Sequence, residues 1–522
     1  MEAIMLQLYE EFNSLGEMFR KSARKYPDKP AVIFQGKTSS YALMEYFSNK
    51  TANFLAEKGI GRGKNVGLYC INSPWFVAAY FGILKTGATV VPVNLLLSPE
   101  EILYILHDSR AAGLIYSDIF ENNVSKVKNS LPGLSFLVAS GKPCIPGALP
   151  FSKILEEGNP DFNIPKLEQK QDVAAILYTS GTTGVPKGAM LTHGNLLFNV
   201  NSILKILTVD ETDVFLTVLP MFHAFGATAG MITPIAAGAT VSAVPKFIPA
   251  DVMQTICDTR ATIFLGVPAM YRLLADLPEN FSCGDLKLRF CVSGGDALPT
   301  ETMKSFEDRY GILIYEGDGP TECSPVTAVN PIGGKRKPCS IGIPVPGVHM
   351  KIADENGDEL KNGQIGEIVV KGESVMKGYF KMEKETAESF FRDWFRTGDL
   401  GYRDDENYFY IVDRKKDMII VNGMNVYPRM VENVICRHSA VSEAAVVPQP
   451  HKLHGEIPRA VIVLRPGEKT SKKEILRFCS EHLGRHEIPR VIEFVEELPK
   501  TPTGKVLKRL LRSGKNPGMG YL

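Results

Sequence analysis

The stretch from Tyr178 to Gly188 combines hydroxyl groups, glycines and a lysine directly after the apolar run Val173–Leu177. Small residues let a backbone turn tightly and present its N–H groups to an anion, while hydroxyls and an ammonium group add donors and charge. The stretch therefore predicts a phosphate-binding loop. It is not a Walker loop, because Lys187 follows a proline and is followed by Gly188 rather than by Ser or Thr. The alternative is a flexible linker, which the apolar runs on both sides disfavour.

Two carboxylates in glycine-containing turns could serve such a loop. Glu322 follows a glycine-rich turn after the apolar run Ile312–Tyr315 and could bind Mg²⁺, a hard cation that prefers oxygen ligands and bridges phosphates. Asp399 lies in a Thr-Gly-Asp sequence and could accept hydrogen bonds from both hydroxyls of a ribose. Each has a simpler interpretation, a surface turn for Glu322 and an Asx-type turn for Asp399.

Two basic residues are further candidates for chemistry. His223 lies between aromatic residues at the end of a predicted strand, where it could orient an acyl group or be a buried core histidine. Lys505 lies in a loop stiffened by proline and glycine, where its ammonium group could stabilise charge that develops on an α-phosphate. The neighbouring Lys508, Arg509 and Arg512 favour a different interpretation, a solvated basic tail.

Composition limits the class of protein. The 522 residues predict two or more domains, and the net charge of +1 argues against a nucleic-acid partner. The nine cysteines form no CxxC pair, which favours reduced thiols, a cytoplasmic protein and no zinc site. No run of about eighteen apolar residues predicts an integral membrane segment. The mildly amphipathic stretch Met5–Phe19 predicts a docking helix and leaves peripheral membrane contact open.

Alternating helical and strand patterns extend over residues 15–165 and again over residues 214–310, which predicts two packed α/β subdomains with largely parallel sheets. Short strands after Pro338 predict a small distorted β-barrel. The charged segment Asp413–Asp417 then predicts a hinge, and the last hundred residues are sufficient for a small α+β domain. The predicted domains are thus 1–412, a hinge at 413–417, and a mobile C-terminal lid at 418–522.

The order of these motifs resembles the adenylate-forming superfamily of acyl-CoA synthetases, non-ribosomal peptide adenylation domains and firefly luciferases, over essentially the whole chain. Beside the phosphate loop, the matching motifs are Pro320-Thr321-Glu322, Thr397-Gly398-Asp399, Asp413-Arg414 and Pro502-Thr503-Gly504-Lys505. Three further segments are most similar to bacterial fatty acyl-CoA ligases: Ser293–Gly295, Val375–Tyr379 and Ile411–Ile420.

The resemblance implies an ATP-dependent acid–thiol ligase that uses Mg²⁺ and coenzyme A. A medium- or long-chain fatty acid would attack the α-phosphorus of ATP to give acyl-AMP and pyrophosphate, and the thiol of CoA would then displace AMP. Because the two half-reactions need different attacking groups in one crowded site, the lid would turn about a hinge near Lys416. This turn would withdraw Lys505 and bring in Gly423 and Met424, where the glycine leaves room for pantetheine.

The resemblance also assigns residues. The catalytic residues would be Lys505, Glu322, Thr182 and His223. The phosphates would be held by Thr179, Ser180, Gly181, Thr182, Thr183 and Lys187. The α-phosphate and the metal would be served by Thr321, Glu322 and Thr182. The adenine and ribose would be bordered by Gly295, Glu316, Gly317, Asp318, Asp399 and Arg414. The acyl pocket would be lined by Phe222, His223, Phe225, Gly266, Val267, Gly294 and Gly295. The hinge and CoA path would comprise Lys416, Gly423 and Met424.

The sequence departs from the family at Asp318, where an aromatic residue usually stacks on adenine. Another group then covers the ring, the nucleotide binds more weakly, or Asp318 accepts a hydrogen bond from the adenine amino group. Several alternatives stay open: an aromatic acid as substrate, a carrier-protein phosphopantetheine as acceptor, and, from another class, an inactive acyl-nucleotide sensor. Nothing in the sequence specifically indicates the oxygen chemistry of luciferases, and a homodimer is neither indicated nor excluded.

Overall fold

The computed structural model describes residues 7–179, 186–279, 281, 284–500 and 506–512. The chain divides into two compact units, one formed by Met1–Met350 with Val370–Phe395 and the other by Lys351–Val369 with Arg396–Leu522. The predicted hinge at 413–417 lies inside the second unit. The predicted domains 1–412 and 418–522 therefore stay a prediction.

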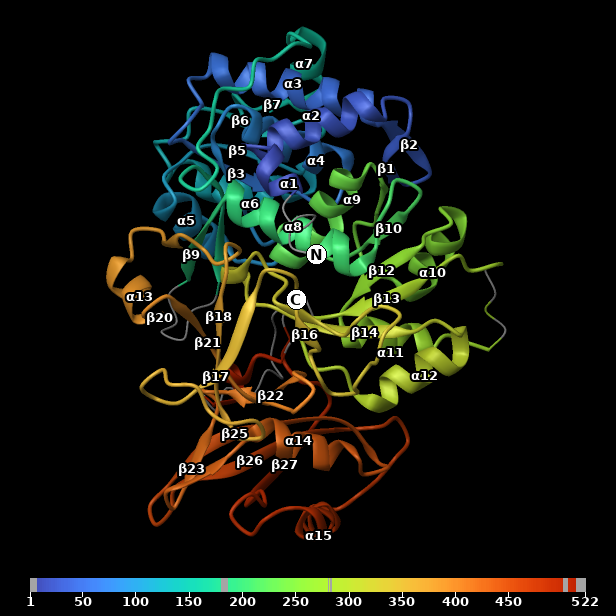
Figure 1. Ribbon diagram of the computed structural model, residues 1–522, viewed down its shortest axis with the longest axis vertical. Coiled ribbons are helices and arrows are strands. Elements are labelled where there is room, and N and C mark those ends of the chain that lie inside the picture. The colour runs from blue at the N-terminus through green and yellow to red at the C-terminus, as the bar shows by residue number, and fades with distance from the viewer. Residues whose placement is uncertain (1–6, 180–185, 280, 282–283, 501–505, 513–522) are drawn as a thin grey trace. The chain divides into compact units, whose positions relative to one another are not determined.

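A nine-stranded sheet in the first unit places the segments that follow its parallel strands at one edge (Figure 1). Its order is β16 (Ile343–Pro344), β15 (Ala328–Val329), β14 (Ile314–Asp318), β13 (Phe290–Ser293), β12 (Ile263–Gly266), β10 (Val214–Thr217), β11 (Thr240–Ala243), β1 (Pro30–Phe34) and β2 (Lys37–Ser40). The strands from β14 to β1 pair in parallel. Since the carboxyl ends of parallel strands share an edge, the segments after β12, β13 and β14 come together there.

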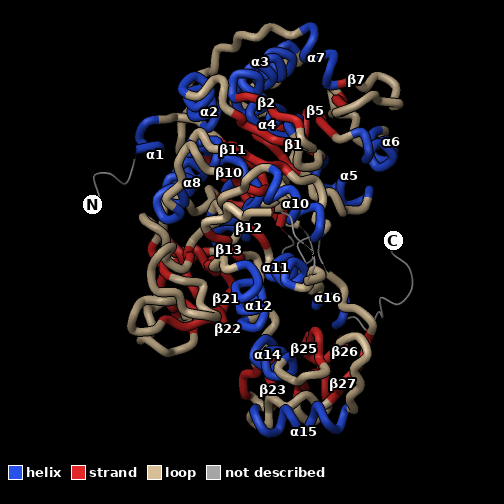
Figure 2. Tube along the Cα trace, turned by 90° about the vertical axis from the view of Figure 1, so that its right-hand side faces the viewer, coloured by secondary structure: helices blue, strands red, loops and turns tan. Residues whose placement is uncertain are grey.

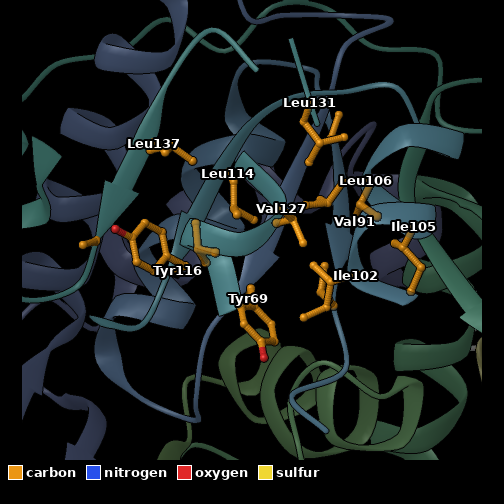
Figure 3. Packing of buried hydrophobic residues seen from close by; sticks show 14 of the residues in the cluster. Tyr69, Val91, Ile102, Ile105, Leu106, Leu114, Tyr116, Val127, Leu131 and Leu137 are labelled. Carbon is orange, nitrogen blue, oxygen red and sulfur yellow. The ribbon is translucent and has the colours of Figure 1, made fainter. Parts of the chain in front are cut away.

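A second sheet of eight strands carries the first predicted subdomain. Its order is β19 (Gly378–Tyr379), β9 (Lys187–Thr192), β8 (Val173–Thr179), β4 (Thr89–Pro92), β3 (Asn65–Tyr69), β5 (Ala111–Tyr116), β6 (Leu137–Ala139) and β7 (Leu149–Pro150). Helices α5 (Pro99–Asp108) and α6 (Glu121–Lys128) bury Ile102, Ile105 and Val127 in one apolar cluster with Leu114 and Tyr116 of β5 (Figure 3). The predicted pair of α/β subdomains is confirmed.

Two segments near the N-terminus differ from the predicted order of subdomains and from the predicted helix. Strand β1 pairs with β11, with Val32 opposite Val241, so it belongs to the sheet of the second subdomain. The predicted docking helix Met5–Phe19 is wrong in its extent, because the chain forms α1 (Gln7–Glu11) and then α2 (Leu15–Lys25). Ser14 caps α2 by accepting a hydrogen bond from the Glu17 N–H at 3.2 Å, which ends one helix and begins the next.

The strands between residues 349 and 414 form a five-stranded sheet. It consists of β17 (His349–Ala353), β18 (Gly366–Lys371), β21 (Trp394–Arg403) and β20 (Phe390–Phe391), and β22 (Phe409–Arg414) pairs with β21. In the second unit a further sheet contains β23 (Ile419–Val421), β24 (Met424–Val426), β25 (Val441–His451), β26 (Gly455–Leu464) and β27 (Val491–Val495). It packs with α14 (Pro428–Cys436) and α15 (Lys472–His482), which gives the predicted small α+β piece (Figure 2).

Two further features concern membrane-spanning helices and the redox state of the cysteines. Within the described ranges, every helix is too short or too polar to cross a membrane. Cys257 is bonded in a disulfide, so the expectation that all cysteines are reduced is wrong at this position.

Candidate active site

Strands β8 and β9 hold the two ends of the predicted phosphate loop. They pair in antiparallel fashion, with Thr179 directly opposite Lys187. Ser180, Gly181, Thr182 and Thr183 lie outside the described residues. The two described members of the predicted loop, Thr179 and Lys187, are thus brought side by side at the ends of a buried hairpin.

Glu322 lies next to this hairpin. It belongs to the short 3₁₀ helix η4 (Thr321–Cys323), and its Oε1 accepts hydrogen bonds from Thr179 Oγ1 at 3.3 Å and from the Tyr379 hydroxyl at 2.9 Å. Its main-chain oxygen accepts a further bond from the Met376 N–H at 2.7 Å. Glu322 is therefore not a simple surface turn, since it connects the loop hairpin with a segment more than fifty residues further along the chain.

Tyr379 lies beside strand β9 of the hairpin and also contacts Glu322. Strand β19 pairs with β9, which places Tyr379 opposite Ala189, and the Lys187 ammonium lies 5.1 Å from the centre of the tyrosine ring. Burial, followed by the nearby charge of Glu322, raises the pKa of Tyr379 far above its usual value. The side chain is therefore a neutral phenol that donates a hydrogen bond to Glu322 and presents its ring face to Lys187.

The carboxyl ends of β12, β13 and β14 form a second part of the site. A Cβ atom added to Gly294 would lie 3.2 Å from the Phe225 ring and 3.3 Å from the main-chain oxygen of Gly317. Gly295 has a φ of +82°, and a Cβ atom there would lie 3.7 Å from Val267. The structure thus brings together five residues of the predicted acyl and adenine borders, and glycines at 294 and 295 keep the space beside Phe225 and Val267 open.

Glu316 and its neighbours contact the loops at the carboxyl ends of these strands and hold them in place. The buried Glu316 carboxylate accepts the Leu298 N–H at 3.0 Å and so fixes the segment after β13. The main-chain oxygen of Asp318 accepts the Thr327 N–H at 3.0 Å. A Cβ atom at Gly319 would lie only 1.4 Å from the main-chain oxygen of Pro325, so the two chain segments cross where only glycine fits.

His223 is exposed, so its interpretation as a buried core histidine is wrong. Its Nδ1 accepts the Phe225 N–H at 3.3 Å, which fixes the ring at the start of the next helix. That helix is a π-helix over Phe225–Ile232, followed by α9 (Thr233–Ala237). Wider helical turns of this kind occur frequently at functional sites.

In the second unit, Asp399 and Arg414 face each other across β21 and β22. Arg414 Nε lies 2.6 Å from Asp399 Oδ1, and Asp399 is buried. The buried Glu367 lies beside them, with its Oε2 3.0 Å from Arg396 and 3.1 Å from Lys415. Glu367 also accepts the Gly398 N–H at 3.3 Å and so holds the segment of β21 that carries Asp399.

The predicted hinge and CoA residues also lie in the second unit. Burial lowers the pKa of Lys416, although Asp417 opposes this effect. Gly423 has a φ of +79° with no described atom within 4 Å of a Cβ placed there, and the side chain of Met424 is exposed. Both are therefore available on the surface of the β23–β24 hairpin, within the part of the chain that the structure describes.

Lys505 lies outside the described residues, but the helix that follows it, α16 (Lys508–Arg512), is described. Lys508 Nζ lies 2.7 Å from Glu432 Oε1, and Arg512 Nη2 lies 2.5 Å from Asp417 Oδ1. Burial opposes the charge of Lys508, but Glu432 and Asp413 outweigh it and raise the pKa. The interpretation of these residues as a solvated basic tail is therefore wrong for Lys508, whereas Arg512 is exposed and pairs with Asp417.

Comparisons with known proteins decide the family. The sequence pattern of the AMP-binding enzymes matches residues 19–380, and that of the AMP-binding enzyme C-terminal domain matches residues 430–505. The chain belongs to the AMP-binding enzyme family. A long-chain-fatty-acid–CoA ligase of Bacillus subtilis (strain 168) is 35% identical to this AMP-binding enzyme over 95% of the chain and 94% of the relative.

Solved structures agree with this assignment. The anthranilate CoA ligase AuaEII in complex with anthranoyl-AMP is 30% identical, with a TM-score of 0.89 over 96% of this chain and 97% of the other. ATP-bound MatB from Rhodopseudomonas palustris is also 30% identical, with a TM-score of 0.88 over 96% and 98% of the two chains. The fold predicted for this AMP-binding enzyme from its sequence is thereby confirmed.

Sequence reasoning gave no role to Tyr379 in the first unit or to Glu367 in the second. Tyr379 appears in the sequence only as part of the segment Val375–Tyr379, and its bond to Glu322 depends on the pairing of β19 with β9. Glu367 has no sequence motif of its own, and its cations come from other elements: Arg396 from β21 and Lys415 from the turn after β22. A carboxylate directly before the apolar run Ile368–Val370 was the available signal, because an ionised group buried in a strand requires partners.

Proposed function

We propose that this AMP-binding enzyme is an acyl-CoA synthetase that activates a medium- or long-chain fatty acid. A carboxylate oxygen attacks the α-phosphorus of ATP, the bond to the β-phosphate oxygen breaks, and pyrophosphate leaves. The sulfur of CoA then attacks the acyl carbon, AMP leaves, and the thiol proton is released. The single observation that carries the proposal is the Glu322 carboxylate held by Thr179 and Tyr379 beside Lys187. The names of the fatty-acid ligases among the relatives support the choice of substrate.

The phosphate side of the proposed site fits magnesium. Mg²⁺ is usually held by one or two carboxylates together with substrate phosphates and water, rather than by a cage of protein ligands. Glu322 supplies one such carboxylate, and only its Oε1 is engaged by described residues. Bound Mg²⁺ would neutralise charge on the phosphates. Thr321 and the undescribed Thr182 complete the proposed metal and α-phosphate contacts, and Lys187 adds a positive charge.

The nucleoside and acyl sides are proposed from the remaining geometry. Asp399 would accept hydrogen bonds from the ribose, with Arg414 holding its carboxylate at 2.6 Å. The acyl chain would pass the space that Gly294 and Gly295 leave open beside Phe225 and Val267. Lys505 would neutralise charge at the α-phosphorus during adenylation and leave with the lid before the thiol arrives.

An aromatic acid is the second candidate substrate, because the anthranilate ligase shares this fold at a TM-score of 0.89. A carrier-protein phosphopantetheine is the alternative acceptor. We also propose a cytoplasmic enzyme, and subcellular fractionation and sedimentation would test this location, peripheral membrane contact and a homodimer.

The deciding experiment measures pyrophosphate release with a panel of fatty acids of increasing length, benzoate and anthranilate, each with CoA or a phosphopantetheinylated carrier protein. The expected result is fastest turnover with a fatty acid of at least about eight carbons and CoA. Faster turnover with an aromatic acid would replace the substrate assignment. Pyrophosphate release with none of the acids, although ATP binds, would support the inactive sensor instead.

A further inference from the structure

We propose that Tyr379 is a positioning residue of the phosphate site, which aligns Glu322 through its hydroxyl and Lys187 through its ring. This inference rests on the proposed function only in that the aligned groups serve Mg-ATP. Tyr379 has no assigned chemistry, yet it is the described side chain that contacts both charged groups at the mouth of the β8–β9 hairpin. It therefore couples a negative and a positive group that must hold one ligand together.

The hydroxyl restricts the Glu322 carboxylate. Both hydrogen bonds that described residues donate to the Glu322 side chain fall on Oε1, from Tyr379 at 2.9 Å and from Thr179 at 3.3 Å. A carboxylate oxygen has two lone pairs in its plane, so these two donors saturate Oε1 and fix the rotation of the group. The plane of the carboxylate, and with it the direction from which Oε2 can meet a cation, is set by the two hydroxyls.

The ring acts on Lys187. A cation 5.1 Å from the ring centre lies within the range of attraction to the negative face of an aromatic ring. A lysine side chain has four rotatable bonds and loses conformational entropy when it is held in one place. A surface that confines the lysine before the phosphate binds therefore reduces the entropic cost of binding. Tyr379 therefore supplies a rigid platform for a flexible cation.

The position of Tyr379 is itself fixed by main-chain bonds on both sides. The Phe380 N–H donates to Gly188 at 2.8 Å and the Lys377 N–H donates to Met190 at 3.0 Å, which locks β19 onto β9. The Met376 N–H donates to the main-chain oxygen of Glu322 at 2.7 Å. These main-chain bonds join the β8–β9 hairpin, the segment that contains Glu322, and strand β19. Tyr379 therefore has little freedom to move away.

The test compares Tyr379→Phe, which keeps the ring, with Tyr379→Leu, which removes ring and hydroxyl. Calorimetric titration of ATP at increasing Mg²⁺ needs no acid substrate. We expect Tyr379→Phe to raise the Mg²⁺ concentration required for tight ATP binding and to lower kcat/KM for pyrophosphate release by about tenfold, the effect of losing one hydrogen bond to a charged group. Tyr379→Leu should weaken ATP binding further at every Mg²⁺ concentration. Thioester formation from supplied acyl-AMP should stay unchanged in Tyr379→Phe.

Tyr116→Phe is the matched control, because the Tyr116 hydroxyl also donates to a glutamate, Glu121 at 3.4 Å, in the same unit but away from the site. It should leave the Mg²⁺ dependence unchanged. Wild-type Mg²⁺ dependence in Tyr379→Phe would overturn the inference, and so would equal losses in both half-reactions together with a lower unfolding temperature. A wild-type enzyme that binds Mg-ATP but activates no fatty acid would refute the proposed substrate while the binding comparison still decides the role of Tyr379.

Discussion

Acidification should destabilise the first unit through His193, the first residue of helix α8 (His193–Leu207). The side chain is fully buried, and its Nδ1 accepts the N–H of Leu15, at the start of α2, at 3.3 Å. This bond requires a neutral ring with its proton on Nε2. Burial lowers the pKa of His193 to about 4, although Asp172 opposes the effect. A positive charge at the N-terminus of a helix would add to the cost.

The size of the effect follows from the two pKa values. In the unfolded chain the histidine has a pKa of 6.5, so it binds a proton at a higher pH than the folded protein does. The stability contribution of the neutral ring is therefore complete above pH 6.5 and is lost as the pH falls towards 4. The loss is about 2 kcal/mol between pH 8 and pH 5 and reaches about 3 kcal/mol at pH 4.

Hydrogen exchange of peptides from α2 and α8 at pH 8, 6 and 5 measures this loss locally, after correction for intrinsic exchange rates. A local measurement is needed because a chain with several domains rarely unfolds in one step. The asparagine in His193→Asn keeps a hydrogen-bond acceptor near the position of Nδ1 but does not titrate. Between pH 8 and pH 5, the free energy of opening α2 and α8 should therefore fall by about 2 kcal/mol less in this variant than in the wild type. His349→Asn, at an exposed position, is the control. Identical pH dependence in His193→Asn and the wild type would refute the reasoning.

Three further substitutions test the remaining assignments. Lys505→Ala should reduce adenylation at least ~100-fold but spare thioester formation from supplied acyl-AMP; equal loss in separate assays of the two half-reactions would contradict its role. Gly423→Leu should slow thioester formation about tenfold and spare pyrophosphate release. Gly467→Leu, at an equally open glycine with φ of +81°, is its control, and unchanged CoA turnover in Gly423→Leu would exclude the pantetheine path. Glu367→Gln should raise KM for ATP about fivefold, because the segment of β21 that carries Asp399 loses its support; a wild-type KM would contradict this.

The sequence predicted the α/β class, because many of the strands are short apolar runs bounded by turn residues. Strand β8, for example, begins at Val173, the first residue of the apolar run before the predicted loop. The pairing of strands that lie far apart in the sequence could not be predicted in this way. The parallel contact of Val32 with Val241 and the addition of Tyr379 beside Ala189 depend on how distant segments pack, which no local periodicity encodes.

The site shows the same limit. Glu322, Asp399 and Lys187 stand out in the sequence because they occur in short glycine-containing motifs whose charged group has a chemical use. Tyr379 and Glu367 do not stand out, because a tyrosine or a glutamate in an apolar strand gains its meaning only from the groups across from it. The π-helix at Phe225–Ile232 likewise has the composition of an ordinary apolar helix.

The crossing at Gly319 affects how tolerance to substitution would be interpreted in this enzyme. With the Pro325 oxygen only 1.4 Å from where any side chain would begin, a library of random variants selected for growth should retain glycine alone at this position. Gly319 would then rank with Glu322 in a map of intolerant positions, although it contributes no reacting group. A parallel screen for protein abundance would separate the two, because substitutions at 319 should deplete the protein itself while Glu322→Gln should leave its amount unchanged.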